Sequence, residues 1–209
     1  MKKGVFCISI ETELLWGRKD LDYSSFIERT KKERFIIKKL LYLFDKYHIS
    51  VTWAITTKML ERPPKAQKNN SLWYGRDILQ MIKSFKIHEI ASHSYSHPEF
   101  TKLSRKEAEE EIKKSKAKSF VFPRNKIKHI EILTKNGFIA YRDIDKNASE
   151  LLLPRIPPVG SPENKKGITR IPSSMYFVSA RGIRKYIPKG LRFIKTKLGV
   201  DKAIRQGKI

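Results

Sequence analysis

The sequence predicts an α/β fold in which strands and helices alternate along one domain. Short apolar or β-branched segments, typical of strands that are buried on both faces, are separated by segments with helical periodicity. Three such strand–helix units in succession indicate parallel connections, which leaves a (β/α) barrel or a doubly wound sheet. With 209 residues, 40% of them hydrophobic, the chain can bury a substantial core.

The first strand is expected at residues 5–10, an apolar run that follows Met1-Lys2-Lys3. This start imitates a signal peptide, but the run is short, and Glu11 and Glu13 follow it without a small-residue cleavage site. We therefore expect a cytoplasmic protein. Cys7, the only cysteine, is expected inside this strand, and a single cysteine excludes an intrachain disulfide framework.

A long helix is expected next, opened by a capping box at Ser25–Glu28 and ending near Tyr47. Its core-facing residues recur with the spacing i, i+3, i+4, i+7: Ile37, Leu40, Leu41 and Phe44. The elements expected after it are a strand at residues 49–57, a proline-bearing loop at 61–70, a helix at 76–85 and a third strand at 87–91.

The second half of the predicted fold starts with another capping box, Ser104–Glu107, whose helix is expected to run through Lys118. It would then meet the strand at residues 119–125 with almost no connection, although such loops normally take ~2–6 residues. The elements expected beyond it are a helix at 127–136 closed by Gly137, a strand at 138–142, and a proline- and glycine-rich loop at 154–162 that could rim a cleft. Residues 182–209 are basic and weakly amphipathic, and no closing strand is visible there.

Side chains that suit a metal site follow two of the expected strands. His93 and His97 lie four residues apart at the end of the third strand, and Pro98 favours a loop over a helix at this point. Glu11 and Glu13 end the first strand, where an extended backbone would turn both toward one face. Imidazole and carboxylate are zinc ligands, so one glutamate could bind a metal and the other act as a base. The alternatives are a chance pair of exposed histidines and two solvated glutamates.

The net charge is strongly positive, because 45 Lys and Arg stand against 21 Asp and Glu, which gives +24. Such a charge could attract nucleic acid, an anionic membrane surface or an anionic substrate. The charge is diffuse, and the chain has no arginine-rich arm or zinc-finger spacing, so no specific nucleic-acid partner is expected. A lysine-rich surface without a function explains it equally well. No apolar run approaches the ~18 residues of a membrane span, which leaves a weak attraction to anionic surfaces.

Four segments, in this order, resemble the motifs of polysaccharide deacetylases, the NodB-homology fold of carbohydrate esterase family 4: Ser9–Gly17, Thr52–Ile55, Glu89–Pro98 and Ser119–Asn125. The resemblance spans residues 5 to about 145, and the segment His93-Ser94-x-x-His97-Pro98 is its most diagnostic part. It implies an incomplete, distorted (β/α) barrel. It also implies metal-dependent removal of an N-acyl group, usually acetyl, from an amino sugar.

Position by position, the resemblance implies that His93, His97 and Glu13 bind a divalent metal, with zinc preferred, and that Glu11 is the catalytic base. The family typically has aspartate at the base position. Glutamate is longer by one methylene, about 1.5 Å, whereas a misplacement of ~1 Å can cost ~10²-fold in rate. Glu11 would therefore be a poor base unless the strand end is shifted to compensate.

The remaining candidate residues act on the base and on the substrate. The family places an arginine two residues before the proline of its third motif, where this chain has Val121. Arg124, just after Pro123, could orient the base instead. The candidate substrate-binding residues are Trp16, Trp73, Tyr74 and Asn125. Trp73 and Tyr74 could form an aromatic platform for a sugar ring, with core packing as the alternative role.

One family feature has no counterpart in this sequence. The family closes its barrel with a late strand that carries a histidine, which protonates the leaving amine, and here no histidine follows His129. A full barrel takes ~250 residues, so the resemblance implies a single domain at 1–209 that lacks its closing strand. We expect weak or absent deacetylase activity. The alternatives are a noncatalytic carbohydrate-binding relic and, less favoured, a non-specific nucleic-acid-binding domain.

Overall fold

The computed structural model describes residues 7–64, 70–144, 162–165 and 167–173, with the single positions 197 and 201. The chain divides into two compact units. The larger unit comprises residues 7–141 and 166–168, and the smaller one comprises residues 1–6, 142–165 and 169–209. All of the candidate site residues belong to the larger unit.

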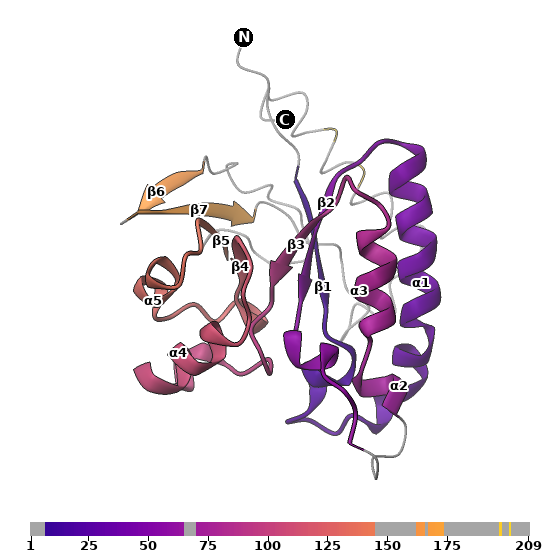
Figure 1. Cartoon of the computed structure of the whole chain (residues 1–209), viewed down its shortest axis with the longest axis horizontal. Coiled ribbons are helices and arrows are strands. Elements are labelled where there is room, and N and C mark those ends of the chain that lie inside the picture. Colours follow the sequence, from indigo (N-terminus) through magenta and orange to yellow (C-terminus); the bar gives the residue numbers. More distant parts are fainter. Residues whose placement is uncertain are drawn as a thin grey trace. The chain divides into compact units, whose positions relative to one another are not determined.

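The larger unit is built on a sheet whose strands follow one another in chain order (Figure 1). Its strands are β1 (Ile8–Thr12), β2 (Val51–Ile55), β3 (Glu89–Ser92) and β4 (Ser119–Val121), followed by the first two residues of β5 (Ala140–Ile144), which continues into the smaller unit. The pairings β1–β2, β2–β3 and β3–β4 are all parallel. The predicted strand–helix units are therefore confirmed, and the carboxyl ends of β1 to β4 meet at one edge of the sheet.

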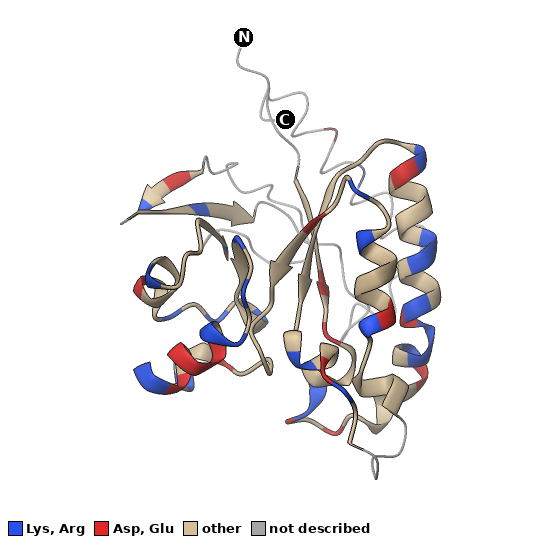
Figure 2. Cartoon of the chain, viewed as in Figure 1, with Lys and Arg blue, Asp and Glu red and all other residues tan. Residues whose placement is uncertain are grey.

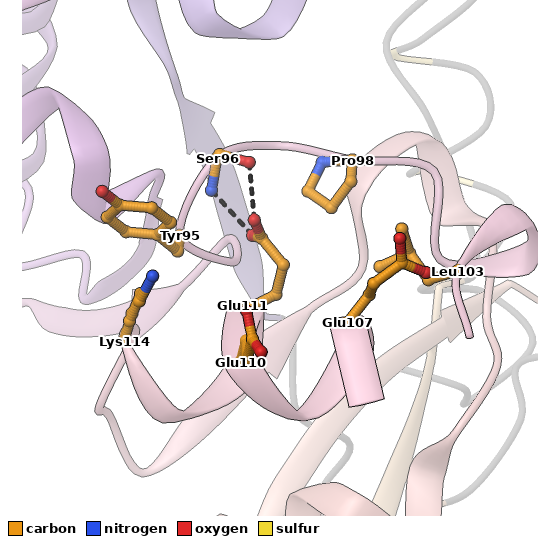
Figure 3. Close-up of a pocket in the computed structure, with 8 residues that line it drawn as sticks. All are labelled: Tyr95, Ser96, Pro98, Leu103, Glu107, Glu110, Glu111 and Lys114. Atoms are coloured by element: carbon orange, nitrogen blue, oxygen red, sulfur yellow. Dashed lines mark hydrogen bonds between the residues drawn. The ribbon is translucent and has the colours of Figure 1, made fainter. Parts of the chain in front are cut away.

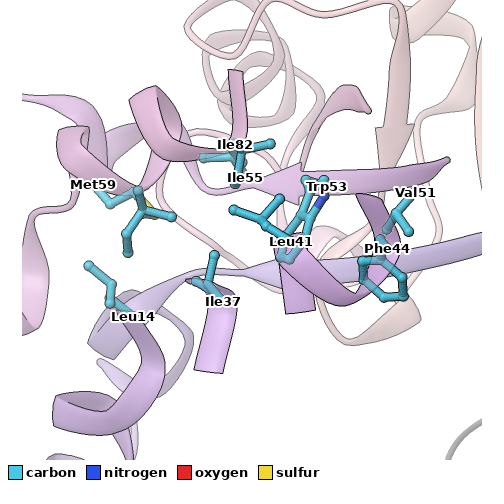
Figure 4. Close-up of a cluster of buried hydrophobic side chains, with 10 residues drawn as sticks. Leu14, Ile37, Leu41, Phe44, Val51, Trp53, Ile55, Met59 and Ile82 are labelled. Carbon is cyan, nitrogen blue, oxygen red and sulfur yellow. The ribbon is translucent and has the colours of Figure 1, made fainter. Parts of the chain in front are cut away.

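Two helices, α1 (Ile27–Lys46) and α3 (Arg76–Lys83), cover one face of β1 to β3 (Figure 1). A third, α2 (Asn70–Trp73), is a single turn. The core under α1 and α3 contains Leu14, Ile37, Leu41, Phe44, Val51, Trp53, Ile55, Met59, Ile78 and Ile82 (Figure 4). Side chains of a strand alternate between faces, so Ala54 lies on the opposite face from Trp53. There Ala54 packs with Ala91 and Val121 in a small separate cluster.

A second core lies between β4, β5, α4 (Arg105–Lys113) and α5 (Ile130–Lys135). It contains Phe100, Ala108, Ile112, Phe120, Phe122, Ile132, Leu133, Phe138, Tyr141 and Ile168. Phe100, Phe120 and Phe122 meet edge to face, with ring centroids 4.8 to 5.6 Å apart. Such contacts add to the stabilisation that burial provides.

Short 3₁₀ helices occupy several loops: η1 (Leu14–Arg18), η2 (Ser24–Phe26), η3 (Thr57–Leu60), η4 (Phe100–Lys102) and η5 (Pro123–Asn125). In the smaller unit, the strand order is β5, β7 (Ile168–Ser173), β6 (Glu163–Lys165). Arg170 Nε donates to Asp143 Oδ2 at 2.5 Å, which links β7 to β5. Neither β6 nor β7 was predicted, because Glu163–Lys165 is short and polar and Pro172 interrupts the strand pattern of β7.

Several local expectations were wrong. Ser25 caps no helix: η2 precedes α1, and Phe26 stands at the N-cap without a side-chain hydrogen bond. The helix from Ser104 does have its capping box, but it ends at Lys113, so residues 114–118 form an ordinary connection to β4. The buried Ser115 explains this end, because its N–H and hydroxyl both donate to the Ile112 carbonyl.

The remaining differences concern boundaries. β1 is shifted toward Glu11, and Cys7 is exposed and precedes the strand. Gly137 follows α5 with φ +81°, as a C-terminal cap requires. The expected loop at 154–162 lies outside the described residues except for its last position, and so does most of the basic segment at 182–209.

Candidate metal centre

Glu13, His93 and His97 converge at the carboxyl edge of the sheet. Glu13 follows β1 and His93 follows β3. Glu13 Oε2 lies 2.7 Å from His97 Nε2 and 3.3 Å from His93 Nε2. One ligand atom from each residue fits within 4.8 Å of the others, and both imidazoles are buried. Side chains some eighty residues apart in the chain thus form one cluster.

The surroundings of His93 determine which ring nitrogen faces this cluster. His93 Nδ1 lies 2.7 Å from the carbonyl oxygen of Val121. Since a carbonyl oxygen can only accept, Nδ1 carries a proton, and Nε2 is the ring nitrogen that faces Glu13 and would offer its lone pair to a metal. A metal-binding histidine commonly has its second nitrogen fixed in this way.

The loop between the two histidines is also held in place. Ser94 Oγ accepts a hydrogen bond from the backbone N–H of His97 at 3.0 Å. Glu111 of α4 accepts from both the backbone N–H and the hydroxyl of Ser96, at 2.8 and 2.6 Å (Figure 3). A neighbouring cavity of about 270 Å³ is lined by Tyr95, Ser96, Pro98, Leu103, Glu107, Glu110, Glu111 and Lys114 (Figure 3). The loop therefore presents His97 from a fixed backbone.

The electrostatics of the cluster favour a charged carboxylate. Burial alone would raise the pKa of Glu13, but its contacts with His93 and His97 hold that pKa well below its ordinary value. Burial lowers the pKa of His93, whereas Glu13 and Glu11 raise it, and the net direction is upward. Glu13 Oε2 and His93 Nε2 are both buried. Although they lie close to each other, neither atom makes a hydrogen bond of acceptable geometry within the described part of the chain. Two imidazoles and one carboxylate are a catalytic zinc donor set, so these residues fit a divalent metal.

Glu11 lies beside the cluster. Its Oε2 is 3.9 Å from His93 Nε2, and its side chain is 36% exposed. β1 ends at Thr12, yet both carboxylates still approach His93. In the sheet, Glu11 is in register with Ala54, and Ala54 with Ala91, so the row beneath the cluster consists of small side chains.

Several residues in the segments that carry the candidate site have a left-handed backbone conformation. Among the described residues other than glycine, seven have positive φ, and five of them lie in the site segments: Leu14, Ser94, His97, Arg124 and Asn125. Such conformations cost about 1–3 kcal/mol each for most residues and persist only where the surroundings impose them. The surrounding fold therefore imposes a costly backbone on the segments that carry these candidates.

Arg124 pairs with a residue that was not predicted. Its guanidinium donates to Asp20 Oδ1 at 2.5 Å. This hydrogen bond lowers the pKa of Asp20, and the charge of His97 contributes in the same direction, which indicates that the pair is close to the cluster. Asp20 belongs to no recognisable motif, so nothing in the sequence singled it out.

Glu33 of α1 was also missed. Burial, followed by the charge of Glu13, raises the pKa of Glu33 to about 7, although a hydrogen bond with the backbone of Leu14 opposes the shift. The apolar stripe of α1 suggested only core packing for this helix face. No residue pattern indicated that a carboxylate from α1 reaches the loop after β1.

The three candidate aromatic residues form one cluster. Trp16 Nε1 donates to the Trp73 carbonyl at 2.8 Å, and its ring centroid lies 5.1 Å from Trp73 and 6.2 Å from Tyr74. All three are partly buried, and Lys58 Nζ lies 4.6 Å from the Trp16 ring centroid. Asn125 is half-buried beside Arg124. The aromatic cluster is thus partly open and partly engaged in packing.

Comparison with known proteins supports the resemblance. Residues 31–119, which include both histidines but neither Glu11 nor Glu13, match the family model described as polysaccharide deacetylase. The resemblance to the polysaccharide deacetylases that the sequence predicted is therefore confirmed over this segment. No curated protein sequence matches the chain.

Three solved structures are similar to this polysaccharide deacetylase-like chain. A de-N-acetylase from Aggregatibacter actinomycetemcomitans is 11% identical, with a TM-score of 0.52 over 86% of this chain and 72% of that one. A 4-alpha-glucanotransferase from Thermococcus litoralis is 15% identical, with a TM-score of 0.51 over 99% of this chain and 31% of that one. A CE4 family pseudoenzyme from Bacillus anthracis is 16% identical, with a TM-score of 0.47 over 67% of this chain.

The two structures with TM-scores above 0.5 establish the fold class and no more. The chain is α/β, of the incomplete, distorted (β/α) barrel type that the resemblance implied. It spans 43% of the length of the Bacillus anthracis structure. Among the described residues, no helix is both long enough and apolar enough to cross a membrane.

Proposed function

We propose that the chain is a metal-dependent hydrolase that removes an N-acetyl group from an amino sugar or polysaccharide. The observation that carries this proposal is the convergence of Glu13, His93 and His97, with His93 Nδ1 held by the Val121 carbonyl and Nε2 facing Glu13. The family of residues 31–119 supports the same chemistry. Zinc is the preferred ion, because two imidazoles and one carboxylate leave a coordination position for water.

A zinc ion held by these three residues would supply a Lewis acid that polarises an acyl carbonyl and acidifies water. Glu11, half-exposed beside His93, accepts the proton of the attacking water. Trp16, Trp73 and Tyr74 offer a platform for the sugar ring, and Asn125 a hydrogen-bonding side chain. Arg124 and Asp20 form a charged pair near the cluster, so Arg124 orients the site through Asp20.

The leaving amine needs a proton, and general acid catalysis is typically worth ~10²–10⁴-fold. No histidine follows His129 in these 209 residues, so the acid that the family uses has no counterpart here. We therefore expect slow turnover of N-acetylated amino-sugar oligomers by zinc-loaded protein. Robust turnover would show that this expectation of weak activity is wrong.

The metal proposal is tested separately by calorimetric titration of zinc into the metal-free chain. Glu13→Ala and His97→Ala should each abolish tight binding, whereas Glu11→Gln should keep it and lose whatever turnover exists. Glu28→Gln is the matched control, because this exposed carboxylate pairs only with Lys31 in the described structure. Unchanged zinc affinity in Glu13→Ala would refute the metal centre.

The second candidate function is a noncatalytic relic that binds carbohydrate, which the partly open cluster of Trp16, Trp73 and Tyr74 favours. The two functions are distinguished by measuring amine release and oligomer binding on the same sample. Binding without release identifies the relic. Release that disappears in Glu11→Gln identifies the hydrolase.

A further inference from the structure

The outer face of α1 carries apolar side chains in contact with solvent. The described residues include ten exposed large hydrophobic side chains, and half of them lie on this helix or directly after it. They are 47% to 60% exposed: Phe35, Ile36, Tyr42, Leu43 and Tyr47. The opposite face of α1 already fills the core (Figure 4), so these side chains are not needed for folding the larger unit.

Lysines share this face in a regular arrangement. Lys32, Lys39 and Lys46 are seven residues apart, which is close to two helical turns, so they form one row along the helix. Phe35 and Tyr42 form a second row on one side, by the same spacing, and Ile36 and Leu43 a third on the other. All three lysines are exposed, and Figure 2 shows the basic residues along α1.

The aromatic rings and the lysines are in contact. Lys39 Nζ lies 4.5 Å from the Phe35 ring centroid, and Lys46 Nζ lies 5.5 Å from that of Tyr47. The acidic residues of α1 oppose this charge little. Glu28 pairs with Lys31 at the start of the helix, and Glu33 hydrogen-bonds with the backbone of Leu14. Asp45 is the remaining carboxylate of the helix, beside the end of the lysine row.

We propose that this face of α1 binds an anionic phospholipid surface, with the helix lying parallel to it. The lysine row complements acidic headgroups, while the flanking apolar and aromatic side chains enter the boundary between headgroups and acyl chains. Tyrosine is favoured at this boundary because its ring is apolar and its hydroxyl polar. The sign of the charge and the apolar rows together select this partner.

Two other partners fit the same face less well. In a two-fold dimer through α1, the lysine rows of two copies would approach each other, and like charges repel. A nucleic acid or another soluble polyanion would be attracted by the lysines alone and would leave the apolar rows unused. Both partners give distinct outcomes in the experiment below.

The test is co-sedimentation of the full chain with vesicles of phosphatidylcholine, with and without one third phosphatidylglycerol. We expect binding only to the anionic vesicles. Changing Lys32, Lys39 and Lys46 together to glutamine should weaken binding about 10²-fold, at roughly fivefold per lysine. Changing the exposed lysines Lys106, Lys116 and Lys118 to glutamine removes the same charge elsewhere and should weaken binding far less. Equal losses in the two triple variants would overturn the proposal in favour of net charge alone.

A second pair of variants tests the apolar rows. Phe35→Ser with Tyr42→Ser should lose vesicle binding while heparin binding stays unchanged, and Phe35→Trp should show a blue-shifted emission with anionic vesicles. An unshifted emission would mean that the face does not enter the bilayer. If light scattering finds a dimer of the wild type and a monomer of the double serine variant, this face of α1 binds a second copy of the chain instead.

Discussion

Gly17 leaves the space that the Glu13 carboxylate occupies. A Cβ atom added at Gly17 would lie 1.9 Å from Glu13 Oε1, which is far inside contact distance. Gly17→Ala should therefore displace Glu13 from the two imidazoles and weaken zinc binding about 10–100-fold, the usual effect of misorienting a ligand. Competition with a chromogenic chelator measures this.

The same variant has an internal control. Metal-free Gly17→Ala should unfold in urea with nearly the wild-type slope, which shows that the fold is retained. A variant that folds and binds zinc as tightly as the wild type would mean that Glu13 is not constrained by Gly17.

Glu33 predicts a pH dependence of stability in the metal-free protein. Its pKa rises from 4.5 to about 7 on folding, so the folded state holds the proton more tightly. Its contribution to stability is present in full below pH 4.5 and is lost as the pH rises through 7. Glu33→Gln stays neutral and can still accept the Leu14 hydrogen bond. Above pH 7, the free energy of unfolding of Glu33→Gln should exceed that of the wild type by on the order of 1–2 kcal/mol.

The measurement is urea unfolding of both proteins in the presence of a chelator. The two should coincide near pH 4 and separate as the pH rises. If the difference in unfolding free energy between the two proteins is the same at pH 4 as above pH 7, the Glu33 carboxylate is not the titrating group.

At the scale of single elements, the two predicted capping boxes had opposite outcomes. Ser104 Oγ accepts from the Glu107 N–H at 3.3 Å, and the Glu107 carboxylate accepts from the Ser104 N–H at 2.8 Å. Ser104→Ala should therefore cost about 1 kcal/mol of unfolding free energy. Ser25→Ala is the matched control and should cost little, because Ser25 does not cap α1.

Denaturant unfolding of both alanine variants at one pH tests this difference. A loss in Ser25→Ala as large as that in Ser104→Ala would contradict the structure. The two serines show why a local motif is insufficient. Both segments have the residues of a capping box, but in the turn before α1 the Ile27 N–H donates to the Ser24 carbonyl instead.

At the scale of the whole molecule, a metal would tie the end of β1 to the loop after β3. Zinc that binds only the folded state should stabilise it, by about 2.7 kcal/mol at a free concentration one hundred times Kd. The gain should fall as the pH drops, because protonation of the histidines opposes metal binding. Thermal unfolding across zinc concentrations measures it, with Glu13→Ala as a variant that should show no gain.

Much of the fold was predictable because the signals are local. Apolar runs, helical spacing and the cap at Gly137 identified the order of most elements and the parallel connections. β6 and β7 were missed because short polar strands carry no such signal. The end of α4 was placed too late because nothing in the neighbouring residue types reveals that Ser115 is buried.

Neighbouring residue types alone were enough to predict two carboxylates at the carboxyl end of the first strand and two imidazoles at that of the third. The folded chain was needed to show that Glu13 approaches both histidines, that the Val121 carbonyl contacts His93 Nδ1, and that Arg124 binds Asp20. The reason is physical. Residue type and periodicity are properties of neighbouring positions, whereas an ångström-scale distance between residues 13 and 93 depends on how the whole sheet packs and pairs.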